Sequence, residues 1–346
     1  MRPPETSRGF PLAAEPTIKP SASTSDELAC YRDLYPRPVT IQHWQLRDLV
    51  HCPYRAGEVY AVNHKRILRH DLITLKSTVA CDLTFEPTSV AFGAGYMAAG
   101  GQNSQLDIRK SCGPFQDDIV FKGHCGGSVN NALKIAKDAS HQRRLFICNN
   151  DDTVKIFSLS IGALVSMVRC PVAISHCALS PNGELMVCVG DNRNTYVYQA
   201  TPVGYRLLNT YTVATDAGMA CDWSPSGSYF ASASQDGLVC VWDARTEALI
   251  TKFCTPLACR NVRFSPAPLD LLAFSEHRGR CHIADARVWT RQQILHVSGV
   301  PDIEPDISGL CFSPTGNKLY VGREDCIMVY DVDSGGRRSF AFAEYL

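Results

Sequence analysis

Short apolar runs alternate with polar or glycine-containing turns along nearly the whole chain. In Ala231–Ile250, ASASQDGLVCVWDARTEALI, one run ends at the turn Gln235-Asp236-Gly237 and a second ends at Trp242-Asp243. Runs of this length between turn residues predict β-strands. The second run is apolar on both of its alternating faces, which is typical of a strand covered on both sides. No window has a convincing helical period, so the pattern predicts an all-β protein.

The same pattern recurs along the chain. Four stretches, starting at residues 176, 220, 261 and 309, each have an apolar run, a Ser-Pro turn and a second apolar run. Proline presets φ at the turn, and Gly183, Gly227 and Gly316 supply a positive φ. A third and a fourth run complete each unit, and three looser copies precede them. The units begin near residues 46, 89, 128, 173, 217, 259 and 306.

Seven four-stranded units predict one seven-bladed β-propeller, because sheets stacked in a closed ring protect one another's edges. We assign the propeller to residues 38–346. Residues 1–37 are rich in Pro, Ser, Thr and charge, and we expect a disordered tail there. Residues 38–45 are a candidate for an extra outer strand near the ring junction, and the sequence leaves open how the ring closes.

The unit at 217–256 resembles the WD-repeat β-propellers. It carries the Trp-Asp pair Trp242-Asp243, the turn residue Asp236 and the strand residue Ser234. The resemblance implies structural roles for Asp236, Ser234 and Trp242 in a buried network that also uses a Gly-His pair. The fifth unit has no such pair before it, so the network is incomplete. The stretches AGEVYAV and GYMAAGGQ are also similar to a poorly characterised group of fungal WD-repeat proteins, which implies no established activity.

Composition narrows the location and the partners. Lys and Arg number 34 and Asp and Glu number 34, so no net positive field attracts nucleic acid. No apolar run approaches the roughly 20 residues that span a bilayer, and no signal peptide is evident. The 16 cysteines form no CxxC pair and many lie in apolar runs. We therefore expect free thiols in the cytoplasm or nucleus, with a disulfide-rich secreted protein as the alternative.

No catalytic, cofactor-binding or metal-binding residue is predicted. The chain has no P-loop lysine motif, no HExxH and no GxSxG, and the glycines of residues 93–101 do not have dinucleotide-loop spacing. Cys177 and Cys221 occupy the same repeat position near the axis, which fits small-residue packing better than a metal site. An enzyme remains an alternative only if acidic, basic or metal-binding groups converge near the axis.

Two surface features are candidates for partner binding. Asp243/Arg245 and Asp285/Arg287 repeat an Asp-x-Arg pattern in the turns after the third strands of neighbouring units. Arginine forks suit docking to carbonyls and carboxylates. In the WD-repeat family, paired motifs of this kind resemble those of substrate receptors that dock on an adaptor of cullin-type ubiquitin ligases. The alternative is that each arginine only completes its own turn.

The second feature is a set of cations in the turns between second and third strands, which fall on the opposite face. These turns would surround a channel mouth and bind an acidic or phosphorylated peptide. Acidic residues in the same turns make solvated charge the alternative. The candidate residues are Lys65, Arg66, Arg193, His277, Arg278 and Arg323. The overall prediction is a non-catalytic scaffold for other proteins, with a ubiquitin-ligase substrate receptor as the rival.

Overall fold

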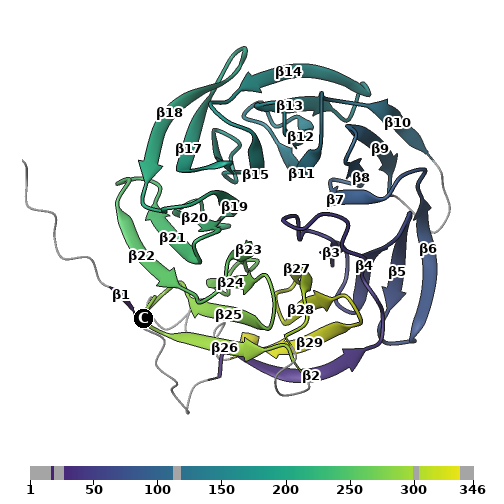
Figure 1. The fold of residues 1–346 in the computed structure, drawn as a ribbon, viewed down its shortest axis with the longest axis vertical. Coiled ribbons are helices and arrows are strands. Elements are labelled where there is room, and N and C mark those ends of the chain that lie inside the picture. The colour runs from purple at the N-terminus through teal and green to yellow at the C-terminus, as the bar shows by residue number, and fades with distance from the viewer. Residues whose placement is uncertain (1–16, 19–26, 112–117, 299–303, 336–346) are drawn as a thin grey trace, which may run out of the picture.

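The strands form seven separate sheets around a central axis (Figure 1). The computed structural model describes residues 17–18, 27–111, 118–298 and 304–335. Six sheets have four strands and one has five. The predicted all-β, seven-bladed propeller is therefore confirmed. We number the blades 1 to 7 in the chain order of their innermost strands.

Each blade is an antiparallel meander that runs outward from the axis. The innermost strands are β3 (Val50–His51), β7 (Pro87–Gly93), β11 (Asn130–Lys137), β15 (Ile174–Leu179), β19 (Gly218–Trp223), β23 (Cys259–Phe264) and β27 (Ile307–Phe312). The second strands are β4 (Glu58–Asn63), β8 (Tyr96–Gly101), β12 (Arg143–Asn149), β16 (Leu185–Gly190), β20 (Tyr229–Ser234), β24 (Leu271–Glu276) and β28 (Lys318–Arg323).

The third strands are β5 (Arg66–Asp71), β9 (Gln105–Lys110), β13 (Thr153–Ser158), β17 (Asn192–Thr201), β21 (Leu238–Asp243), β25 (Arg280–Asp285) and β29 (Ile327–Val332). The outermost strands of blades 1 to 6 are β6 (Lys76–Asp82), β10 (Ile119–His124), β14 (Ala163–Arg169), β18 (Gly204–Thr212), β22 (Leu249–Cys254) and β26 (Gln292–His296). A short strand, β1 (Thr17–Ile18), adds to the outside of β22 in parallel.

Burial on both faces explains why the inner strands are apolar without alternation. β15 and β24 are buried at every position, whereas β6 has one buried residue in seven. Neighbouring blades cover both faces of the inner strands, and the outer strands are the most exposed to water. Trp242 is 2% exposed and stacks on Phe230 at 5.2 Å between ring centroids.

The predicted turn roles in blade 5 have a clear geometry. Ser234 donates a hydrogen bond to Asp236, and Asp236 also accepts the backbone N–H of Leu238 at 3.1 Å. The other carboxylate oxygen accepts the N–H and the hydroxyl of Thr215, at 2.6 and 2.8 Å. Thr215 thus ties the turn to the segment before the blade, where the family pattern places a histidine.

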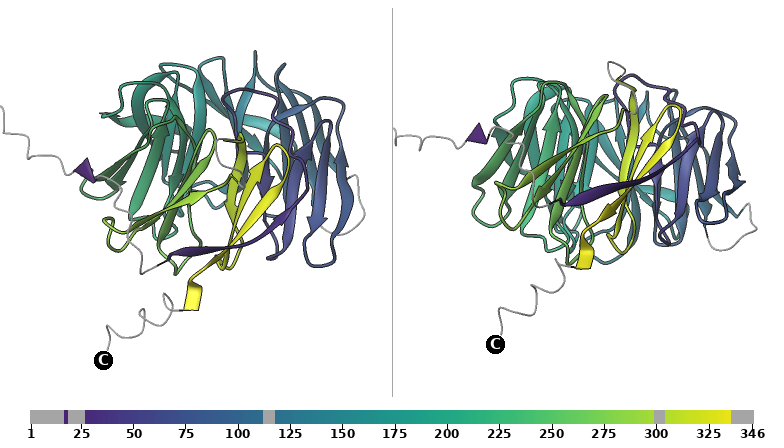
Figure 2. Two further views of the ribbon diagram at one scale, coloured as in Figure 1. Left: turned by 60° about the horizontal axis from the view of Figure 1, so that its bottom comes forward. Right: turned by 90° about the horizontal axis from the view of Figure 1, so that it is seen from below.

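The ring closes with a strand from near the N-terminus. The outermost strand of blade 7 is β2 (Ala29–Tyr35), which pairs antiparallel with β29 from Ala29↔Val332 to Tyr35↔Ile327. It crosses the outside of the blade in Figure 2. The expected tail at 1–37 therefore extended too far, because residues 29–35 form the outermost strand of blade 7. Residues 1–16 and 19–26 lie outside the described residues.

Candidate functional site

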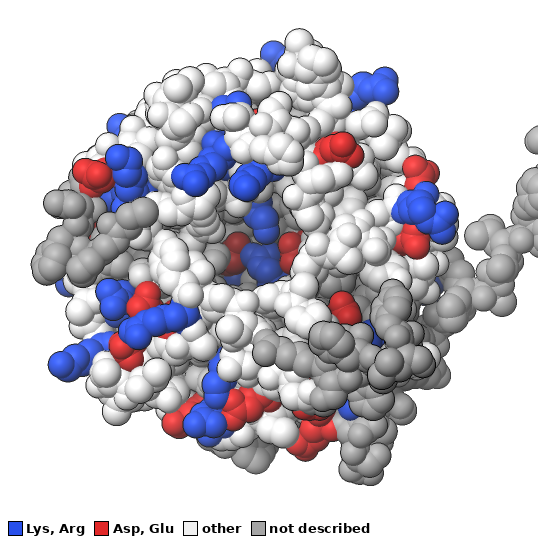
Figure 3. Space-filling model, turned by 180° about the vertical axis from the view of Figure 1, so that it is seen from behind, with Lys and Arg blue, Asp and Glu red and all other residues white. Residues whose placement is uncertain are grey.

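The loops of the ring fall on two faces. The face toward the viewer in Figure 1 carries the turns between second and third strands and the connections between blades. The opposite face, seen in Figure 3, carries the turns between first and second strands and between third and fourth strands. We call the first the strap face and the second the far face.

Residues 36–49, which we call the strap, cross the channel mouth on the strap face. They form no strand, contrary to the extra outer strand considered for residues 38–45. The strap is instead hydrogen-bonded to blades 7, 1, 2 and 6 in turn. These bonds are Val39 N–Glu324 O at 3.2 Å, Thr40 N–Val62 O at 2.9 Å, Gln102 Nε2–Gln42 O at 3.1 Å and Asn261 Nδ2–Arg47 O at 3.1 Å.

The strap therefore covers the mouth at which a peptide was expected to bind. A cavity of about 20 Å³ lies beneath it, lined by Gln45–Asp48 of the strap and by residues of the innermost strands. That volume holds about one water molecule. A partner that approaches this face meets the strap itself.

Trp44 is the most exposed large side chain of the strap, with 63% of its surface accessible. Its ring lies 5.3 Å from the guanidinium carbon of Arg260, a cation–π contact, and it stacks on His43 at 6.2 Å. Arg260 itself is 7% exposed. The indole is thus held by a buried cation while much of its surface faces solvent.

The channel wall beyond the strap carries paired charges. Arg263 lies 2.6 Å from Asp48, and Lys134 lies 3.6 Å from Asp222. Burial, the largest influence on Asp48, would raise its pKa, but Arg263, His51 and His176 together outweigh burial and hold that pKa at about 2. Figure 3 shows cationic and acidic side chains together in the central hollow of the far face. Each of these two pairs is electrically neutral as a unit.

Histidine and cysteine near the axis are held neutral. Burial lowers the pKa of His176 to about 3 and raises the pKa of the Cys221 thiol well above its ordinary value. The Cys221 sulfur lies 3.5 Å from His176 Nδ1. Within the described ranges, no three His, Cys, Asp or Glu side chains gather as a metal site would require.

Three of the six residues in the predicted ring of cations form ion pairs within the chain itself. Arg66 lies 2.8 Å from Asp82, and Arg278 lies 3.4 Å from Glu304. Arg323 is buried, and its guanidinium bonds Asp325 at 2.6 and 2.9 Å and the Val297 carbonyl at 2.7 Å. Because the Arg323 side chain is buried, it does not lie at the channel mouth, contrary to the sequence-based expectation. His277 is half-buried, whereas Lys65 and Arg193 are exposed.

On the far face, the two Asp-x-Arg turns are built alike but end differently. Asp243 accepts the N–H of Arg245, and Asp285 accepts the N–H of Arg287, both at 2.9 Å. The Arg287 side chain then bonds Asp270 and the Pro268 carbonyl, both at 2.9 Å. Arg245 is exposed, and its side chain has no ion pair within the described part of the chain. Of these two arginines, only Arg245 therefore has a guanidinium without an ion pair among the described residues.

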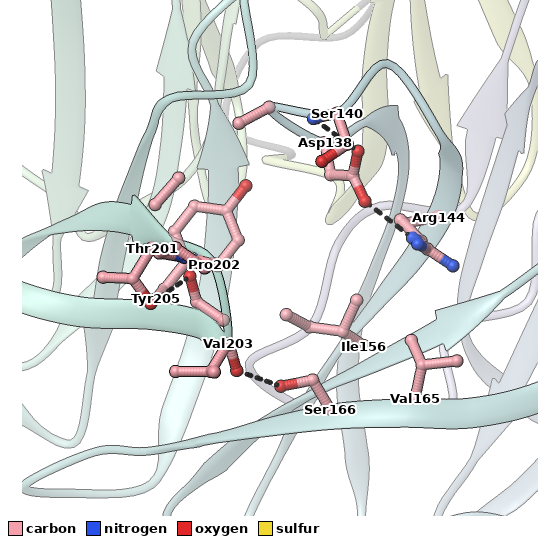
Figure 4. Close-up of a pocket in the computed structure, with 13 residues that line it drawn as sticks. Asp138, Ser140, Arg144, Ile156, Val165, Ser166, Thr201, Pro202, Val203 and Tyr205 are labelled. Atoms are coloured by element: carbon pink, nitrogen blue, oxygen red, sulfur yellow. Dashed lines mark hydrogen bonds and ion pairs between the residues drawn. The ribbon is translucent and has the colours of Figure 1, made fainter.

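A groove of about 260 Å³ lies between blades 3 and 4 on the far face (Figure 4). Arg144 and Asp138 pair across 2.7 Å on one side, and Ser166 donates to the Val203 carbonyl at 3.4 Å on the other. Val203 is 89% exposed at the tip of the β17–β18 turn. The sequence analysis did not find this groove, because two turns remote in sequence form it.

Comparison with known proteins agrees with the architecture. The family model of the WD domain, G-beta repeat, matches residues 207–243, and that of an uncharacterised protein domain (DUF2415) matches 258–296. An uncharacterised protein of Schizosaccharomyces pombe is 28% identical over 339 residues, covering 91% of this chain and 96% of that protein. An uncharacterised protein of Saccharomyces cerevisiae is 24% identical over 238 residues, or 55% of this chain and 32% of that protein.

Echinoderm microtubule-associated protein-like 2 of Rattus norvegicus is 32% identical over 152 residues, which are 43% of this chain and 22% of that protein. The repeat match falls on the unit that contains Trp242, and the ring has the seven blades that the repeats predict. The seven sheets and the match to the WD-domain repeat together define a seven-bladed β-propeller that contains a WD-type repeat. One unit of the chain matches the WD-repeat family model, and uncharacterised fungal proteins are among the relatives of the chain. No helix in the described residues is long and apolar enough to cross a membrane.

Proposed function

We propose that this WD-repeat protein is a non-catalytic scaffold that binds a partner protein through the loops of its strap face, with Trp44 at the centre of the contact. Trp44 supports the proposal because it is 63% exposed yet held in place by Arg260 and by the bonded strap. Tryptophan and arginine contribute most strongly to binding at protein interfaces. A side chain that is already ordered also loses less entropy on binding.

The ionisable groups of the channel support the non-catalytic part of the proposal. The carboxylates Asp48 and Asp222 are each paired with a cation, and His176 and Cys221 are held neutral. A general base or an activated nucleophile needs a pKa near the working pH. The ion pairs of the two carboxylates and the shifted pKa values of His176 and Cys221 do not favour a general base or an activated nucleophile.

The experiment is quantitative affinity purification of the tagged full chain from the cells that express it. Trp44→Ala is compared with Tyr31→Ala, which removes an aromatic side chain 57% exposed on β2 at the rim. We expect at least one partner to be retained by wild type and Tyr31→Ala and lost from Trp44→Ala. An identical partner set for all three proteins would refute binding through the strap face.

A second candidate function is a substrate receptor that docks on a ubiquitin-ligase adaptor through the far face. The exposed and uncommitted guanidinium of Arg245 favours it, whereas the Asp270 contact of Arg287 weakens the paired-arginine version. Ligase subunits that co-purify with wild type and disappear from Arg245→Ala/Arg287→Ala would establish this function. Their absence from the wild-type sample would exclude it.

A further inference from the structure

The pocket beneath the strap holds more buried positive charge than buried negative charge. Arg47, Arg260 and Arg263 line it, together with one carboxylate, Asp48. Arg263 is neutralised by Asp48 at 2.6 Å, and Arg47 reaches Asp306 at 3.2 Å. Arg260 has no carboxylate within ion-pair distance in the described chain. An unpaired buried charge is costly, and a counter-charge from a ligand would relieve that cost.

The hydrogen bonds of Arg260 are also incomplete. The side chain is more than nine-tenths buried, and its Nη1 donates only to the thioether sulfur of Met219, at 2.9 Å. Sulfur is a weak acceptor. Its Nε–H has no partner. The guanidinium lies over the Trp44 ring, and its hydrogen-bond donors lie along its edge.

Arg47 also lines this pocket and also has an unused donor. Its Nη1 donates to the carbonyl oxygens of His43 and Leu46, at 2.6 and 3.3 Å, and its Nη2 to Asp306. Its Nε–H, like that of Arg260, has no partner. Burial and the nearby charge of Arg47 lower the pKa of Arg260 to about 10.

We infer that this pocket binds an oxyanion, a phosphate or carboxylate group that accepts from Arg47 and Arg260 beneath Trp44. The cavity of about 20 Å³ has room for one oxygen-sized atom, so the group would place one oxygen inside and extend toward solvent. Charge-assisted bonds of this kind are the stronger class of hydrogen bond. The inference rests on the proposed function and deepens it, since it defines the chemistry that a partner would present at Trp44.

Two sources could supply the oxyanion: a free inorganic ion or an acidic side chain of a partner. The test is thermal unfolding of the full chain in increasing inorganic phosphate, with chloride adjusted to constant ionic strength. A second series uses a short synthetic peptide with one phosphoserine, beside its glutamate and serine versions. A ligand present at ten times its Kd should raise the unfolding midpoint by about 2 °C for a chain of this size.

We expect this rise in wild type and in Arg193→Met, which removes an exposed arginine of the same face that does not line the pocket. We expect no rise in Arg260→Met. Arg260→Lys, which keeps the charge but has no Nε–H, is the second variant and should lose most of the rise. A response to the anionic peptides at lower concentration than to phosphate identifies a partner side chain as the source.

No rise in wild type with any of the anions overturns the inference, as does an equal loss in Arg193→Met and Arg260→Met, which would indicate diffuse surface charge. Partner capture through Trp44 is measured separately. Capture without an anion response would leave the proposed function standing and remove the oxyanion site. A rise in unfolding midpoint with anions, without Trp44-dependent capture of a partner, would leave the oxyanion site standing and remove the proposed function.

Discussion

Leu28 lies just before β2, in a region that sequence alone assigns to a disordered tail. In the ring it is 1% exposed and belongs to an apolar cluster with residues of blades 6 and 7, such as Leu269 and Val332. Its N–H donates to Gln293 Oε1 at 2.7 Å, and its carbonyl accepts from Asp333 at 3.1 Å. If β2 closes the ring, Leu28→Ala opens a cavity in this cluster.

Truncating a fully buried leucine to alanine costs about 3 to 5 kcal/mol when the surroundings cannot collapse into the space. For a propeller of about 300 residues, 1 kcal/mol corresponds to about 1.5 °C in unfolding midpoint. We therefore expect Leu28→Ala to lower the midpoint by about 5 to 8 °C. Differential scanning calorimetry of the full chain measures it.

Leu34→Ala is the matched control, because Leu34 belongs to β2 itself and is 38% exposed. It should cost less than about 1 kcal/mol, in line with its partial burial. A midpoint change for Leu28→Ala that does not exceed the change for Leu34→Ala would refute closure by β2. The segment would then behave as the tail that its composition indicates.

Two further predictions concern titration and thiol chemistry. Burial lowers the pKa of His70 to about 4 and that of His176 to about 3, below the value near 6.5 of an unfolded chain. The unfolded state binds these protons more tightly than the folded state does. The free energy of unfolding is therefore at its full value above pH 6.5. As the pH falls from 6.5 to the folded-state pKa values, that free energy decreases by about 1.4 kcal/mol per histidine per pH unit. Urea unfolding from pH 7 to 4.5 measures this decrease, and His70→Asn should reduce the slope of the free energy of unfolding against pH. A slope that is unchanged in His70→Asn would contradict the prediction. Of the described cysteines, only Cys30 and Cys254 are exposed. A thiol reagent at pH 7 should therefore modify these two first and should modify buried cysteines, such as Cys259, only when the protein unfolds. Mass spectrometric mapping that finds Cys259 modified in the folded protein would contradict this prediction.

The repeats were predictable because each one is encoded locally. Gly183, Gly227 and Gly316 have φ values of 73, 75 and 72°, as their place after Ser-Pro predicts. A side chain at Gly183 would also come within 2.5 Å of the Asp138 backbone. Turn chemistry and two-sided burial therefore define these blades without reference to the rest of the chain.

Ring closure was not predictable in this way. β2 pairs with a strand about 300 residues away, and its own burial pattern is exposed at five of seven positions. The strap has no periodicity, and its place is determined by separate hydrogen bonds to four blades. Contacts between remote segments leave no local signal in one sequence.

The candidate cations show the same limit. Arg323 reads as an exposed turn residue, although Asp325 two positions later could have indicated its ion pair. The Arg287 contact with Asp270 spans two turns of one blade and has no such signal. Residue type thus indicates which groups can bind a partner, while packing decides which of them are already committed.

The measurement that tests the central claim most directly is the affinity of the purified full chain for the first partner it captures, with and without Trp44. A tryptophan at the centre of an interface contributes about 2 kcal/mol or more, so Trp44→Ala should raise the Kd at least about 30-fold. Tyr31→Ala should leave the Kd within about twofold. Equal Kd values for wild type and Trp44→Ala would contradict binding through the strap face.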